Sequence, residues 1–90
     1  MTVNEIVEMF QNAAATRYDM EYWHIEAMLR EATAARRVFN FYSTYEAYTY
    51  AEANRIVRDR IEQCEDPLEA CCEFAEELHS IYMRKFPPVR

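Results

Sequence analysis

Apolar residues recur every three or four positions along most of this chain, the spacing that places them on one face of an α-helix. Thr2 and Glu5 form a capping box at the start of the first series, because each side chain can bond the other residue's backbone N–H. Asp19 is suited to cap a second helix. The series that follow these two caps are Val3, Ile6, Val7 and Phe10, then Tyr22, Ile25, Leu29, Ala32 and Phe39. The pattern predicts a short first helix and a long second helix.

The same combination of a cap and an apolar series appears twice in the second half of the chain. Thr49 and Glu52 form another capping box. Asp66 offers an N-cap, followed by Pro67 at the first helical position and Glu69 in the first turn. The two series are Tyr50, Ala53, Val57, Ile61 and Cys64, then Leu68, Cys71, Cys72, Ala75, Leu78 and Tyr82. We predict an all-α fold, a compact four-helix arrangement.

Residues 39–50 hold six aromatic side chains and interrupt this regularity. At about 100° per residue, Phe39 continues the core face of the second helix. The opposite side carries Val38, Phe41, Tyr45 and Tyr48. We expect this aromatic face to line a second interface, either with the first helix or with another chain, because tyrosine combines an apolar ring with a hydroxyl that tolerates water.

Three conformations of this aromatic segment stay open. The helix breaks near Ser43, which forms a capping box with Glu46, or it continues with both faces apolar. The third is a hairpin that pairs residues 38–42 with 47–51, because aromatic residues favour strands. The capping box favours a break, and the hairpin lacks a good turn residue.

The composition narrows the class of protein. Residues 1–90 suffice for a single domain with a modest core. The chain contains no glycine, so it lacks the residue on which phosphate-binding loops and dinucleotide-binding fingerprints depend. Tight β-hairpins also rely on glycine. These observations exclude P-loop, Rossmann and kinase folds and favour helices.

Three cysteines lie close together, and their number is odd. Cys64, Cys71 and Cys72 do not have the spacing of a zinc site and fall on the expected core faces. We therefore expect reduced thiols that act as small apolar core residues. No signal peptide or membrane-spanning segment is apparent, so we expect a cytoplasmic protein. We also expect that it holds no metal and no cofactor.

Two E-x-x-H segments give the sharpest chemical signal, since di-metal carboxylate bundles use such motifs on two helices. They are Glu21 to His24 and Glu76 to His79. The other two helices direct their acids away from the core, so a di-metal bundle is only a distant alternative. Ser80 directly follows His79, and adjacent side chains diverge on a helix. We expect that the protein is not an enzyme.

Charged residues also fall on the expected core faces. Glu21 and Arg36 do so on the second helix, and Arg60 does so on the third. We expect ion pairs at the boundary of the core, with the long side-chain stems lying along apolar surface.

The distribution of charge is uneven. The net charge is −6, and residues 61–83 contain seven acids and no lysine or arginine. On the fourth helix, Glu69, Glu73, Glu76 and Glu77 share the face opposite the cysteines. We expect this acidic stripe to bind a partner with a basic surface. The same charge opposes direct nucleic-acid binding, which depends on neutralising phosphates.

Trp23 is the only tryptophan. It lies on the side of the second helix that faces away from Ile25. We expect the first helix or the C-terminal tail to cover it. Left exposed, it would be a candidate anchor for a partner, because tryptophan is enriched in binding hot spots.

In size and charge the chain resembles small inhibitors from phages and mobile elements, including anti-CRISPR proteins, many of which are short, acidic and non-enzymatic. This resemblance implies an inhibitor or adaptor that binds a larger partner with a basic surface, which could itself bind nucleic acid. The alternative is a homo-oligomeric structural or regulatory helical module.

Overall fold

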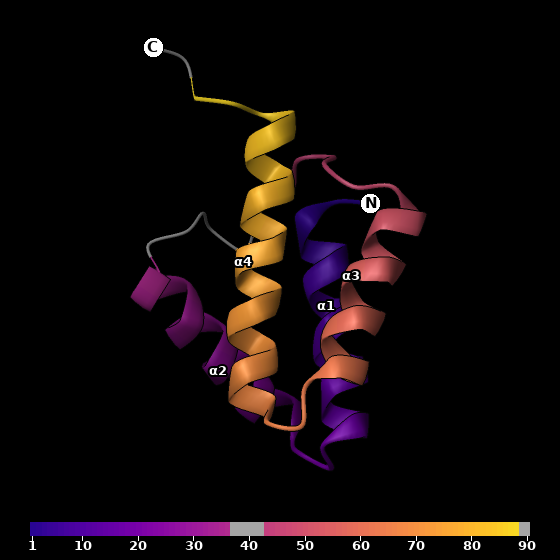
Figure 1. Ribbon diagram of the computed structural model, residues 1–90, viewed down its shortest axis with the longest axis vertical. Coiled ribbons are helices and arrows are strands. Elements are labelled where there is room, and N and C mark those ends of the chain that lie inside the picture. Colours follow the sequence, from indigo (N-terminus) through magenta and orange to yellow (C-terminus); the bar gives the residue numbers. More distant parts are fainter. Residues whose placement is uncertain (37–42, 89–90) are drawn as a thin grey trace.

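The computed structural model describes residues 1–36 and 43–88, and this part of the chain folds into four α-helices without a strand. The helices are α1 (Val3–Arg17), α2 (Tyr22–Arg36), α3 (Tyr50–Gln63) and α4 (Pro67–Lys85) (Figure 1). The predicted all-α, four-helix arrangement is confirmed. Helix α1 has 15 residues and is shorter than α4, which with 19 residues is the longest helix within the described ranges. Helix α2 has 15 residues up to Arg36, and its expected continuation to Phe39 lies outside the described residues.

Each helix packs against two others, in the spatial order α1, α2, α4, α3 and back to α1. Their inward faces enclose one core. The largest fully buried side chains are Phe10, Phe74, Ile6, Ile25, Leu29, Ile56, Leu78, Val3 and Cys71. Phe10 from α1 and Phe74 from α4 stack with their ring centroids 4.1 Å apart, so the core also joins two helices that are not neighbours in this order.

The apolar series identify most of the core, with errors at the first members of three of them. Tyr22, Tyr50 and Leu68 stand at the starts of their helices and are exposed. The core residues that the series omitted are Ala14, Ala47, Tyr48, Ile56, Ala70, Phe74 and Ile81.

Three of the four expected N-caps form as predicted. Thr2 accepts a hydrogen bond from the Glu5 amide at 3.2 Å, and Thr49 accepts one from the Glu52 amide at 3.1 Å. The Asp66 carboxylate accepts from the Leu68 amide at 2.9 Å. These caps satisfy backbone donors that the helix itself cannot pair.

Asp19 does not cap α2, so that prediction is wrong. Its φ of 53° places it in the left-handed region, just after the end of α1. The Met20 amide donates to the Ala15 carbonyl at 3.0 Å and the Asp19 amide donates to Thr16 at 3.4 Å, which is the pattern of a Schellman C-cap. Glycine usually occupies this position, and aspartate tolerates it better than most residues. In a chain without glycine, Asp19 ends α1 instead of starting α2.

The segment from Ser43 to Thr49 is neither helix nor hairpin. It runs along the start of the chain, where the Met1 carbonyl accepts from the amides of Ala47 at 3.3 Å and Tyr48 at 3.2 Å. The Met1 α-amino group donates to the Tyr48 carbonyl and pairs with Glu46 at 3.1 Å. The two-faced helix does not extend through these residues, and the first strand of the proposed hairpin, 38–42, lies outside the described residues.

Candidate functional site

The predicted acidic stripe on α4 is divided by ion pairs with α3. Glu77 pairs with Arg55 at 3.1 Å, and Glu73 pairs with Arg60 at 2.9 Å. Glu69 and Glu76 remain exposed. Two of the four acids of the predicted stripe therefore have basic partners, which the spacing on α4 alone does not predict because the arginines belong to α3.

Glu73 belongs to a small polar cluster where α3 ends. Its carboxylate accepts a hydrogen bond from the Cys64 thiol at 3.1 Å and one from Arg60 at 2.9 Å. These bonds, the first of them most, hold the pKa of Glu73 below its usual value. The expected ion pair of Arg60 at the core boundary is thus confirmed. Glu21 and Arg36 were the other two charged residues expected at the core boundary. Glu21 is exposed, and the Arg36 side chain lies outside the described residues.

Replacing Glu73 with glutamine should destabilise the fold by about 1–2 kcal/mol at pH 7, between the values for exposed and buried ion pairs. A carboxylate with a lowered folded-state pKa contributes stability above its unfolded-state value, here near 4.5, and loses it as the pH falls through the folded-state value. Urea denaturation at pH 7 and pH 3 measures the difference. The deficit of the variant should shrink at pH 3. Glu62→Gln is the control, since its pair with Arg58 is exposed. Equal deficits at both pH values would contradict this account.

The cysteines are free, as expected. Cys64 and Cys71 are buried, and Cys72 is half-buried. Burial raises the pKa of the Cys64 thiol to about 11, with the hydrogen bond to Glu73 adding to it, and burial raises that of Cys71 to about 12. Both thiols therefore stay protonated at neutral pH and serve as core residues.

The two E-x-x-H segments do not converge. Glu21, His24 and Glu76 are exposed, and His79 is half-buried. Across the described ranges 1–36 and 43–88, no three histidine, cysteine or acidic side chains come together in a way that could hold a metal ion. The imidazole of His24 instead stacks on the Trp23 ring, with the centroids 5.3 Å apart.

The two described residues of the predicted aromatic face, Tyr45 and Tyr48, differ in burial. Tyr48 is 4% exposed, and its hydroxyl donates to the Leu78 carbonyl at 2.7 Å, so it belongs to the core. Tyr45 is 64% exposed. The two tyrosines were grouped by helical spacing, but they lie on an extended segment where that spacing does not apply. Val38 and Phe41 lie outside the described residues.

Trp23 is 66% exposed, so the expectation that another part of the chain covers it is wrong. It lies in the first turn of α2, two residues before the fully buried Ile25. A large apolar ring in this position contacts water across most of its surface. Trp23 is therefore a candidate anchor for a partner, which was the alternative interpretation of this residue from the sequence.

Two turns meet at the end of the molecule where α2 begins. The α1–α2 and α3–α4 turns both lie at the lower end of Figure 1. The Tyr18 hydroxyl donates to the Cys64 carbonyl at 2.7 Å, and Arg17 pairs with Glu65 at 3.5 Å. These contacts bring residues that are more than forty positions apart in sequence to one end of the molecule.

Acidic side chains are concentrated at these two turns. All six are exposed, and we call them the acidic end: Asp19, Glu21, Glu62, Glu65, Asp66 and Glu69. Two of them have basic partners, Glu62 with Arg58 and Glu65 with Arg17, and both pairs are exposed to solvent. Exposed ion pairs of this kind contribute little to the stability of the fold. Their members can therefore easily pair with a charged group of another molecule instead. Trp23 and the acidic end together form the candidate site.

Comparison with models of protein families, with curated proteins and with solved structures finds no match for this chain. In the described residues, no helix combines the length and the apolar character needed to cross a bilayer. The candidate site therefore rests on its own geometry.

Proposed function

We propose that this protein is a small, acidic, non-enzymatic interaction protein that binds a larger partner through Trp23 and the acidic end. The observation that supports this proposal most is the exposure of Trp23, a large apolar side chain that is 66% exposed in the first turn of α2 and follows the α1–α2 turn of the acidic end. Tryptophan contributes a large apolar contact area at low conformational cost. Charged residues around such an anchor guide the approach of the partner and select its charge.

The partner has a basic surface with an apolar hollow that receives the indole ring. Acids gathered at one end attract such a surface over roughly 8–10 Å at physiological salt. The hydrogen bond between Tyr18 and Cys64 and the ion pair of Arg17 with Glu65 hold the two turns together before binding. Little conformational entropy is then lost when the partner docks.

Binding at this site inhibits or recruits the partner, in the manner of the small acidic anti-defence proteins of phages and mobile elements. A basic surface that normally holds nucleic acid would be blocked by the acidic end. Direct nucleic-acid binding by this chain is disfavoured by its net charge of −6. The free thiols suit a reducing compartment, so we place the interaction in the cytoplasm.

Reversing two charges of the acidic end should weaken partner binding by about tenfold or more. The variant is Glu21→Lys with Glu69→Lys, which places lysines on both turns. The partner is first captured from cell extract on the immobilised protein, then purified and titrated by calorimetry at low and high salt. The affinity of the unaltered protein should fall as salt rises, because screening weakens charge pairing.

The matched control is Glu8→Lys with Glu31→Lys, since both acids are exposed on the outer faces of α1 and α2 and give the same change in net charge. Its affinity should stay within about threefold of the unaltered protein. Equal losses of affinity in both variants would mean that binding depends only on the net charge of the protein.

Light scattering should show that the protein is a monomer, whereas a defined oligomer would favour the homo-oligomeric module.

A further inference from the structure

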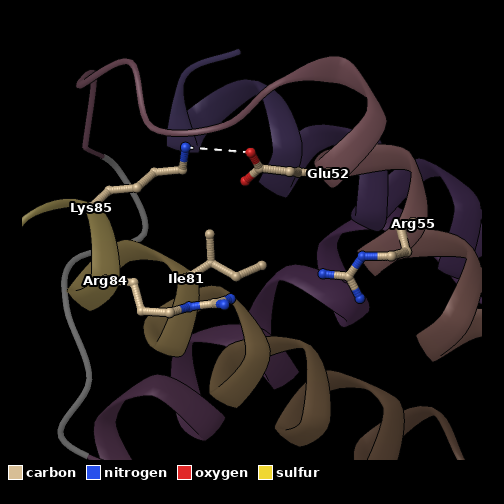
Figure 2. A pocket seen from close by; sticks show the side chains of 5 residues that line it. All are labelled: Glu52, Arg55, Ile81, Arg84 and Lys85. Atoms are coloured by element: carbon tan, nitrogen blue, oxygen red, sulfur yellow. Dashed lines mark ion pairs between the residues drawn. The ribbon is translucent and has the colours of Figure 1, made fainter.

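A pocket of about 340 Å³ lies between α3 and the last turns of α4, far from the acidic end. Its lining residues are Glu52, Arg55, Ile81, Arg84 and Lys85 (Figure 2). The volume is near the lower limit for small-molecule sites. Three of the five residues are basic, in a chain whose net charge is −6.

The partners of these basic groups differ. Lys85 pairs with Glu52 at 3.3 Å across the mouth of the pocket. Arg55 pairs with Glu77 at 3.1 Å and approaches Asp59 at 3.7 Å. Arg84 forms no ion pair with any described residue. Its charge is therefore not balanced within this part of the chain.

The direction of Arg84 is unexpected for an acidic protein. Figure 2 shows its guanidinium group pointing across the pocket toward that of Arg55. The chain has 16 acids and 10 lysines and arginines, so acidic partners are plentiful. The helix dipole explains why basic residues occupy the last turn of α4. It does not explain why one of them faces a second guanidinium group.

We propose that this pocket binds an oxyanion, the phosphate or carboxylate group of a small organic molecule. A guanidinium group has five N–H donors in a planar fork that matches both groups. Arg55 uses Nη2 to donate to Glu77 and has Nη1 3.7 Å from Asp59, whereas the guanidinium group of Arg84 has no ion-pair partner among the described residues. An oxyanion in the pocket supplies Arg84 with the acidic partner that the described residues do not provide.

The remaining lining residues of the pocket indicate the polarity and charge of the rest of the ligand. Ile81 is buried and gives the pocket an apolar wall, so the molecule carries a short apolar part beside its anionic group. Glu52 repels a second anion unless Lys85 exchanges its partner. The site is separate from Trp23 and does not depend on the proposed function.

Inorganic phosphate and succinate serve as probes in two parallel titrations of the full chain. Two-dimensional NMR spectra at low salt should show saturable shifts for residues around Arg55 and the last turn of α4, with a dissociation constant of about 1 mM or below. Tighter binding of phosphate identifies a phosphate ester as the ligand class, and tighter binding of succinate identifies a carboxylate.

Arg84→Gln should weaken the preferred probe by about tenfold. Arg58→Gln is the control, because Arg58 is exposed on α3, does not line this pocket, and gives the same change in net charge. Arg84→Lys keeps the charge without the planar fork and should bind with intermediate strength. Circular dichroism confirms that each variant is folded. Absence of saturation with both probes, or equal losses in the Arg84 and Arg58 variants, would overturn the proposal.

Discussion

Replacing Phe74 with alanine should lower the free energy of unfolding by about 3–5 kcal/mol, the range measured for large aromatic residues removed from cores. Phe74 is fully buried and stacks on Phe10 with an angle of 14° between the rings. The variant loses the transfer free energy of the ring, and it leaves a cavity between α1 and α4 that the surrounding helices cannot fill without moving.

Urea denaturation followed by circular dichroism measures this change. A domain of this size has a total stability of about 5–15 kcal/mol, so the alanine variant keeps only a small margin. Phe74→Leu retains more side-chain volume than the alanine variant. Its free energy of unfolding should lie between those of the unaltered protein and of Phe74→Ala. Leu68→Ala on the same helix is the control, because Leu68 is 46% exposed and its loss should cost less than about 1 kcal/mol. Similar costs at both positions would contradict the observed core.

Replacing Trp23 with alanine should leave the stability within about 1 kcal/mol of the unaltered protein while weakening partner binding by about thirtyfold or more, equivalent to about 2 kcal/mol. Its side chain is 66% exposed, so the fold gains little from it. In the complex the ring would be buried at the centre of the contact, where truncation costs most.

Tyr50→Ala is the matched control for this change. Tyr50 is 67% exposed, almost the same fraction as Trp23, but it lies at the start of α3, at the other end of the molecule. Calorimetric titration of the purified partner should give nearly unchanged affinity for this variant. Greater loss of affinity with Tyr50→Ala than with Trp23→Ala would move the contact to the opposite end.

Features that depend on neighbouring residues in sequence were predictable. The caps at Thr2, Thr49 and Asp66 each use a backbone donor two or three residues away, so the sequence contains both partners. The inward faces of the helices follow from the same local spacing. Asp19 shows where local reasoning fails, because one residue type suits both an N-cap and a left-handed C-cap.

Features that depend on distant residues were not predictable. The ion pairs of Glu73 and Glu77 require α3 to lie beside α4, which the spacing on α4 alone does not reveal. The acidic end arises because the Tyr18 hydroxyl reaches Cys64 and joins two turns. An indication was present in the sequence, since acids flank both predicted helix junctions, but the pairing of those junctions is a property of the fold.

We propose that Trp23 and the acidic end form the contact with a basic partner. Two-dimensional NMR spectra of isotope-labelled protein, recorded with and without the captured partner, locate this contact. We expect the largest changes at the Trp23 indole N–H and at the backbone amides of the two turns. Changes confined to residues 81–86 at the end of α4, with the Trp23 signal unmoved, would contradict it.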